Sequence, residues 1–266
     1  MNTKFVLRGF LIALPVTLIG LAAGLALVVT RALPPLDPTP LPPTILAPRG
    51  ELPAGPVGLQ EWVQYRGEPY NLVGSGFFIL LDDGEIVAVT TAHSVSLDDP
   101  DHPPERIGLR VAGQADFVAE LDRLRGQPGR PLTVEDLTVD YVLLQPALPI
   151  DSAFALAPDP RGAPQPGERV SLFSGLGDGR GGRRILEGTV QSVGGTAVWV
   201  LMDEIFDPGL MSGSPLVSQH TGQVVGMAVA ASPRRGRLLI GVHPIGSIVG
   251  LAEAATEFLV LDEYRR

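Results

Sequence analysis

The sequence predicts an all-β protein whose strands fall into two groups and are followed by one C-terminal helix. Short apolar segments alternate with turn residues from Leu59 onward, which is typical of strands joined by tight connections. A proline-rich stretch, Pro146 to Pro166, separates these segments into an earlier and a later group. After the last predicted strand, apolar residues recur with helical spacing over residues 247–259, at Ile248, Leu251, Ala255 and Phe258.

The predicted strands can be assigned to two lobes, at about residues 59–150 and 165–250. In the first lobe they are Val73–Leu81, Glu85–Thr91, Ile107–Val111, Ala115–Leu121 and Val139–Gln145. The first two of these flank Asp82-Asp83-Gly84, which is typical of a hairpin turn. In the second lobe they are Arg169–Phe173, Arg184–Val193, Ala197–Met202, Ser214–Ser218, Val224–Ala231 and Leu238–His243.

The composition excludes several classes of function. The 266 residues are 45% hydrophobic, which is enough to bury a full core, and the formal net charge of −9 provides no basic surface for a nucleic acid. Cysteine is absent, so the chain has neither disulfides nor a thiol nucleophile. The single lysine, Lys4, lies close to the N-terminus, which excludes a serine–lysine catalytic pair in the β domain.

Residues 1–31 predict a cytoplasmic N-terminus and a transmembrane signal anchor. Lys4 and Arg8 precede an uncharged segment, residues 9–30, which as a helix would span about 33 Å, the thickness of a bilayer core. Basic residues before the span keep the N-terminus cytoplasmic and place the rest of the chain outside. The alternative is a cleaved signal peptide, for which Thr30-Arg31-Ala32 is a poor cleavage site.

Residues 32–58 predict an extended linker, because they are dense in proline and therefore form neither helix nor sheet. A spacer between the membrane and the β domain is the preferred interpretation, and a ligand for a proline-recognition domain is the alternative.

Three short motifs carry the candidate chemistry. His93 follows the apolar segment Val87–Ala92, and Asp140 opens the apolar segment Tyr141–Leu144. An acidic residue entering an apolar strand loses solvation and needs a partner, which the His93 ring would supply. The third motif is Ser212-Gly213-Ser214-Pro215. Asp136 is the alternative to Asp140, and Ser214 is the alternative to Ser212.

The order His93, Asp140, Ser212 resembles that of the trypsin/chymotrypsin-like serine peptidases. The resemblance implies two six-stranded antiparallel β-barrels with a C-terminal helix over residues 59–266. It also implies that Ser212 is the nucleophile, His93 the base and Asp140 its partner. The whole arrangement resembles the protease part of bacterial, membrane-anchored HtrA-type proteins, although too few residues follow Ser212 for a PDZ domain.

The resemblance assigns the oxyanion hole to the backbone N–H groups of Leu210 and Ser212. The family usually has glycine at the Leu210 position and Asp or Asn at Met211, so this chain departs from the pattern at both. A shift of one residue that uses Gly209 is the alternative. The resemblance also places Phe206 at the floor of the specificity pocket, which would make it shallow or apolar, and an acidic floor from Asp207 is the alternative.

The sequence thus predicts a single-pass membrane protein whose extracytoplasmic domain is a serine endopeptidase acting on peptides or proteins. The alternative is an impaired module of the same fold that binds a peptide or protein without cleaving it. Residues 9–30 would contact the bilayer, and no cofactor or metal is expected. His243 is expected to be packed structure. One acidic loop contains Asp98, Asp99, Asp101, His102 and Glu105. This loop is interpreted as solvated, and calcium binding is the alternative.

Overall fold

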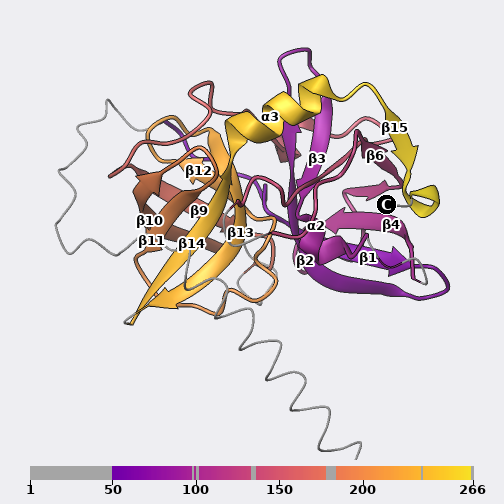
Figure 1. Cartoon of the computed structure of the whole chain (residues 1–266), viewed down its shortest axis with the longest axis horizontal. Coiled ribbons are helices and arrows are strands. Elements are labelled where there is room, and N and C mark those ends of the chain that lie inside the picture. The colour runs from indigo at the N-terminus through magenta and orange to yellow at the C-terminus, as the bar shows by residue number, and fades with distance from the viewer. Residues whose placement is uncertain are drawn as a thin grey trace, which may run out of the picture. The chain divides into compact units, whose positions relative to one another are not determined.

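The computed structural model describes residues 50–97, 99, 102–132, 136–177, 184–234 and 236–264, which form two β lobes followed by a helix (Figure 1). No helix among these residues is long and apolar enough to cross a membrane. The predicted span at residues 9–30 and the linker up to residue 49 lie outside the described part of the chain.

The first lobe is a sheet that surrounds its own apolar core, and all of its strand pairs are antiparallel except that of β2 with β8. Its strands follow the order β15-β6-β7-β3-β2-β1-β4-β5, and β8 pairs with β2. Apart from β15, its strands are β1 (Leu59–Tyr65), β2 (Tyr70–Leu80), β3 (Ile86–Thr90), β4 (Pro104–Arg110), β5 (Ala119–Leu121), β6 (Arg123–Arg125), β7 (Val142–Leu144) and β8 (Ala155–Leu156). A short 3₁₀ turn, η1 (Ser152–Phe154), precedes β8.

The first lobe is not the closed six-stranded barrel that was expected. Its backbone ladder stays open, because β5 and β6 belong to opposite arms of the sheet and are joined only by Asp122. The covalent connection through Asp122 thus joins the two arms where hydrogen bonds between strands would otherwise close the barrel. The expected strand Ala115–Leu121 is also shorter, since only Ala119–Leu121 pairs with β4.

The second lobe is a closed barrel with the strand order β10-β11-β14-β13-β12-β9. Its strands are β9 (Arg169–Ser174), β10 (Arg184–Val193), β11 (Val198–Met202), β12 (Pro215–Ser218), β13 (Val224–Arg234) and β14 (Arg237–Pro244). Along β10 the alternating residues Leu186 and Val190 are buried while Glu187 is exposed, as expected for a strand with one face on a core. This lobe therefore agrees with the sequence prediction.

The C-terminal helix α3 (Ile245–Ala254) is shorter than the predicted 247–259. It buries Ile245, Ile248 and Ala252, which lie on one face at a spacing of three and four residues. Phe258, expected on this face, instead begins β15 (Phe258–Val260) and pairs with Arg125 of β6. The chain therefore leaves the second lobe through α3 and adds an edge strand to the first (Figure 1) before ending in η2 (Leu261–Glu263).

The described end of the predicted linker, residues 50–58, packs on the β domain. The Gly50 N–H donates to the His220 carbonyl of the second lobe at 2.7 Å. Val57 is fully enclosed just before β1 begins. These residues therefore contact the second lobe before the chain enters the first.

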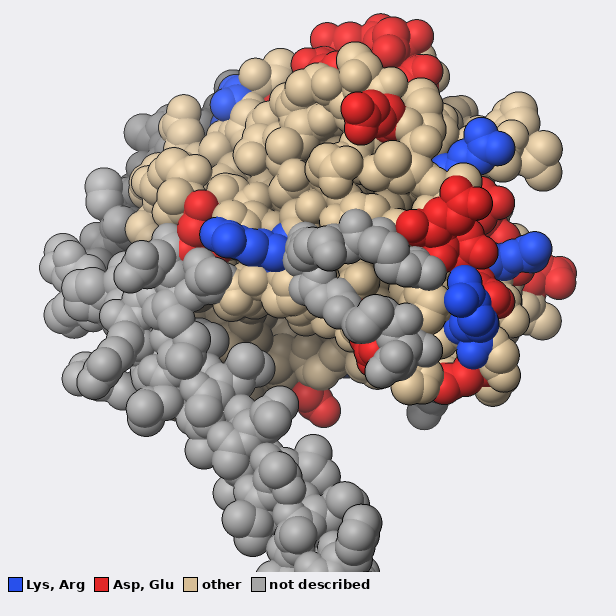
Figure 2. Space-filling model, turned by 45° about the vertical axis from the view of Figure 1, so that its right-hand side comes forward, with Lys and Arg blue, Asp and Glu red and all other residues tan. Residues whose placement is uncertain are grey.

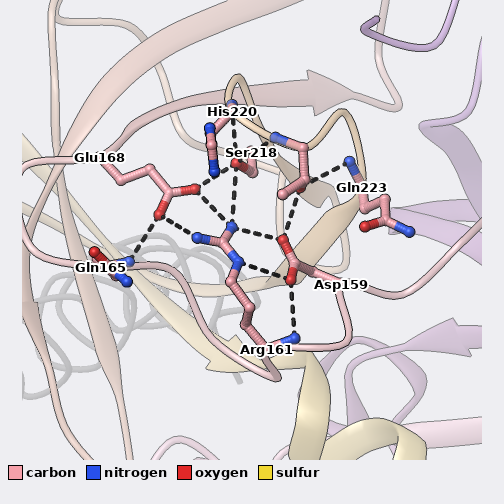
Figure 3. A network of polar contacts seen from close by, with 8 residues as sticks. Asp159, Arg161, Gln165, Glu168, Ser218, His220 and Gln223 are labelled. Atoms are coloured by element: carbon pink, nitrogen blue, oxygen red, sulfur yellow. Dashed lines mark hydrogen bonds and ion pairs between the residues drawn. The ribbon is translucent and has the colours of Figure 1, made fainter. Parts of the chain in front are cut away.

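A buried ionic network fixes the connection between the lobes to the second barrel (Figure 3). Arg161 donates to Asp159 and Glu168, whose side chains are 0% exposed. Thr221 donates to Asp159 at 2.7 Å, and Ser218 donates to Glu168. Burial alone would raise the pKa of both carboxyl groups, but these hydrogen bonds lower the pKa of each. Both carboxylates therefore stay ionised inside the protein.

Charge is distributed unevenly over the surface. Figure 2 shows one face, on which acidic side chains form separate groups with a few basic side chains beside them. A broad uncharged area lies between these groups. Acidic residues outnumber basic ones in the whole sequence, which gives the net charge of −9.

Candidate active site

His93 lies in a one-turn helix, α2 (Ala92–Val95), directly after β3. The turn ends at Ser96, which adopts a left-handed conformation with φ of 51°. The Thr91 and Ser94 hydroxyls are 2.5 Å apart, and the Tyr65 hydroxyl donates to the Val95 carbonyl at 2.9 Å. These contacts fix the turn while the His93 side chain keeps 31% of its surface exposed.

Asp140 is brought to His93 by the pairing of β3 with β7. Thr90 is opposite Val142 in this antiparallel ladder, so the residues after Thr90 and before Val142 meet at one end. One Asp140 oxygen lies 2.6 Å from His93 Nδ1 and accepts the Leu132 N–H at 3.1 Å. The other accepts the His93 N–H at 3.1 Å. The carboxyl group is completely buried and holds both the backbone and the ring of His93.

Asp136, the alternative, is engaged elsewhere. Its Oδ1 accepts the Thr138 N–H at 2.8 Å and the Thr138 hydroxyl at 2.5 Å. These contacts close a local turn and engage the Asp136 carboxylate there, whereas the Asp140 carboxylate contacts the His93 ring.

Ser212 lies in a turn of the second lobe, just before β12. The Ser214 N–H donates to the Met211 carbonyl at 3.0 Å, and Gly213 has φ of 89°, which defines a tight turn at Ser212-Gly213. Ser212 is partly exposed, whereas Ser214 is 0% exposed and its hydroxyl has no partner within the described residues. Only Ser212 therefore presents a hydroxyl that a substrate can reach.

The Ser212 turn is joined to the first lobe through β2. The Ser75 N–H donates to the Ser212 carbonyl at 2.9 Å, and the Ser75 carbonyl accepts the Thr90 hydroxyl at 2.9 Å. Thr90 ends the strand that leads to His93. In the described part of the chain, no hydrogen bond joins the Ser212 hydroxyl to the His93 ring. Such bonds are often long before substrate binds.

The predicted oxyanion donors are free to bind. In the described structure neither the Leu210 N–H nor the Ser212 N–H has a hydrogen-bond partner. The alternative donor, the Gly209 N–H, is taken by Asp207 Oδ1 at 2.9 Å. Leu210 adopts φ of 62°, a left-handed conformation that glycine occupies readily and leucine rarely does.

Phe206, predicted at the floor of the specificity pocket, is 9% exposed and packs in the second-lobe core together with Met211. The Arg184 guanidinium lies 5.8 Å from the Phe206 ring centroid. Asp207 is exposed and accepts the Gly209 N–H, so its carboxylate is directed to the local turn.

Sequence reasoning missed Glu61, a completely buried residue of β1 whose two carboxyl oxygens have no hydrogen-bond partner among the described residues. Burial raises the pKa of Glu61 to about 8. Glu61 alternates with Leu59 and Val63, which are also buried, so the strand period contained a signal for its position. His243, expected to be packed structure, is completely buried and meets the Tyr141 ring edge-on at 6.0 Å.

The acidic loop is described only in part, because Asp98 and Asp101 lie outside the described residues. Asp99 accepts the His102 N–H at 3.3 Å, and Glu105 lies 3.6 Å from Arg66. No group of three acidic or histidine side chains suited to a metal occurs in the part of the chain that the structure describes.

Comparison with protein families shows to which family this chain is related. Residues 74–227 match the trypsin-like peptidase domain family. The chain belongs to this family. The match covers more than half of the chain and includes His93, Asp140 and Ser212, and membership in the family implies a hydrolase that acts on peptides or proteins. Comparison with curated protein sequences gives no match.

Solved structures show the same trypsin-like fold at low sequence identity. A serine endoprotease from Yersinia pestis is 17% identical, with a TM-score of 0.50, over 76% of this chain and 65% of that chain. This chain thus spans less than two thirds of that protein. A thermostable serine protease, AL20, from an extremophilic microorganism is 10% identical over 76% and 97% of the two chains, with a TM-score of 0.53. Kallikrein-related peptidase 10 is 15% identical over 76% and 95%, also with a TM-score of 0.53.

Proposed function

We propose that this trypsin-like peptidase is an active serine endopeptidase with Ser212 as nucleophile, His93 as general base and Asp140 as the group that orients His93. The contact of 2.6 Å between Asp140 Oδ2 and His93 Nδ1 is the observation that carries the proposal. A buried carboxylate at Nδ1 selects the tautomer that leaves Nε2 free to accept a proton.

In the first half of the reaction, Ser212 Oγ attacks the carbonyl carbon of the scissile peptide bond. The hydroxyl proton passes to His93 Nε2, and the new positive charge on the ring is stabilised by Asp140. Collapse of the tetrahedral intermediate breaks the C–N bond, and His93 returns the proton to the leaving amine. The product is an acyl ester on Ser212.

In the second half, His93 removes a proton from water as the water attacks the acyl carbon, and then returns it to Ser212 Oγ. The acid product leaves, and the enzyme regains its starting protonation state. In both halves the negative charge develops on the former carbonyl oxygen. The N–H groups of Leu210 and Ser212, which have no partner among the described residues, would stabilise it.

A fluorophosphonate probe combined with active-site titration tests the proposal. An assembled site should label rapidly at Ser212 and release close to one leaving group per molecule from a chromogenic ester. Labelling that is absent, or that persists after Ser212→Ala, would contradict it.

A peptide- or protein-binding module of the same fold is the second candidate. Two observations favour it: Leu210 occupies a left-handed conformation, and no hydrogen bond joins the Ser212 hydroxyl to His93 in the described structure. This candidate predicts saturable peptide binding by the wild type, with no titration and no hydrolysis.

We further propose that the domain is tethered to a membrane and works outside the cytoplasm, on the basis of the uncharged segment 9–30 after Lys4 and Arg8. Full-length protein should stay in the membrane fraction during alkaline carbonate washing. External protease should release a folded fragment that keeps residues 50–58, because the Gly50 N–H is bonded to the β domain. A mature N-terminus at Leu33 would show instead that the segment is a cleaved signal peptide.

A further inference from the structure

Ser75 makes contacts that extend beyond its place in β2. It is 0% exposed. Besides its two backbone hydrogen bonds to Ser212 and Thr90, its hydroxyl donates to the Leu210 carbonyl at 3.0 Å. One first-lobe residue therefore holds two residues of the second-lobe turn, one at the candidate nucleophile and one at the candidate oxyanion donor.

Leu210 needs such support because of its backbone conformation. Its φ of 62° brings Cβ close to the following carbonyl in any residue except glycine. The side chain is 43% exposed, so little packing offsets this strain. Contacts of its backbone therefore hold Leu210 in the left-handed conformation.

Both ends of the peptide unit between Leu210 and Met211 are held. Its carbonyl accepts the Ser75 hydroxyl at 3.0 Å, and its N–H donates to the Pro208 carbonyl at 3.1 Å. This unit lies between the two free N–H groups, those of Leu210 and Ser212. If it rotated, the orientation of both donors relative to each other would change.

We propose that Ser75 is a positioning residue for the oxyanion hole, whose hydroxyl keeps Leu210 in the conformation that a glycine would adopt without help. The inference rests on the proposed function, because it assigns a task to the donors of that site. Ser75 acts through Leu210 and does not touch the reacting atoms. The space for its hydroxyl exists because position 175 is glycine, where a Cβ would lie 2.6 Å from Ser75 Oγ.

A double-mutant cycle between Ser75→Ala and Leu210→Gly tests the inference. In the wild-type background, Ser75→Ala should lower kcat roughly tenfold or more and change KM less than about twofold, because the lost interaction matters for charge in the transition state. The affinity for a peptide boronic acid should fall with kcat/KM. In the Leu210→Gly background the same substitution should lower kcat less than about threefold, because glycine adopts the left-handed conformation unaided.

Ser171→Ala is the matched control. Ser171 is also 0% exposed, and its hydroxyl accepts the Gln219 side chain at 3.1 Å within the second barrel. Its loss should lower the denaturation midpoint and leave kcat unchanged. An equal loss of kcat for Ser75→Ala in both backgrounds would overturn the inference.

Measurements of unfolding stability distinguish a failure of this inference from a failure of the proposed function. A wild type that does not titrate would overturn the proposed function and the catalytic part of the inference. The same four proteins then report on the conformational part through their unfolding midpoints. Ser75→Ala should shift the midpoint more with Leu210 present than in the Leu210→Gly background, and equal shifts would show that Ser75 does not hold Leu210.

Discussion

Glu61 and Gly74 are opposite each other in the ladder between β1 and β2, and the Glu61 carboxyl group fills the space beside Gly74. A Cβ at Gly74 would lie 2.8 Å from Glu61 Oε2, 3.0 Å from the Ser94 hydroxyl and 3.3 Å from the Ser212 carbonyl. Gly74 therefore lies close to a buried carboxyl group and to the segments that carry His93 and Ser212.

Glu61→Gln should make the protein more stable at neutral and alkaline pH. Burial raises the pKa of Glu61 to about 8, so between pH 4.5 and 8 the unfolded chain releases a proton that the folded chain keeps. Over this window each pH unit lowers the free energy of unfolding by about 1.4 kcal/mol, and above pH 8 the loss levels off. The difference between variant and wild type should be on the order of 3 kcal/mol at pH 7 and vanish near pH 4.

Urea denaturation between pH 4 and 9 measures this difference. The exposed Glu253 supplies the control, because Glu253→Gln makes the same chemical change at an exposed site. Parallel curves for the wild type and Glu61→Gln would show that Glu61 ionises normally in the folded protein.

Ser212→Ala should abolish fluorophosphonate labelling and lower hydrolysis by ~10⁴-fold or more, because the three candidate residues act as a unit. Ser214→Ala should keep most of the activity and should not lower stability, since it removes a buried hydroxyl that has no partner among the described residues. The reverse pattern would assign the nucleophile to Ser214.

Asp140→Asn should preserve the fold and lower kcat by ~10⁴-fold, because an amide beside Nδ1 favours the wrong tautomer of His93. Asp136→Asn is the control, since the Asp136 carboxylate is engaged by Thr138. Steady-state hydrolysis of a peptide ester compares the two. A larger loss for the Asp136 variant would transfer the orienting role to it.

His243→Phe should remove part of the acid sensitivity of the fold. Burial lowers the pKa of His243 from 6.5 to about 4, so the folded chain binds fewer protons than the unfolded chain between these values. This residue therefore contributes stability above pH 6.5 that is lost as the pH falls to 4. The dependence of unfolding on pH over that range should be flatter for the variant, and His102→Gln, at an exposed site, is the matched control.

Arg161→Met and Arg169→Met should differ strongly although each arginine bonds two carboxylates. Asp159 and Glu168 are completely buried, and a charge left unpaired there costs roughly 3–5 kcal/mol. Glu187 and Asp203, the partners of Arg169, are about half exposed, and a surface pair contributes roughly 1 kcal/mol at most. Equal denaturation midpoints for the two variants would contradict this assignment.

The sequence predicted the second lobe well, because strand periodicity is a local pattern, whereas the site residues that the motifs indicate stay a prediction. Strand periodicity located β9 to β14, and short motifs identified His93, Asp140 and Ser212, of which the structure joins the first two directly. The edge strand β15 of the first lobe could not be predicted, since it pairs with β6, which lies more than 130 residues earlier in the sequence. The Arg161 network was missed because it joins Asp159 and Arg161 of the predicted connection to residues far apart in the sequence, such as Glu168 and Ser218.

The pairing of β15 with β6 also sets the order in which the molecule can be completed. While the chain is being synthesised, the first lobe can collapse around Phe77, Phe78 and Ile79, but its sheet lacks an edge strand until residues 258–260 have emerged. The second barrel needs β14, which is made only shortly before. Both lobes are therefore finished only after β14 and β15 have left the ribosome, so a chain that has just produced Ser212 still holds an incomplete candidate site.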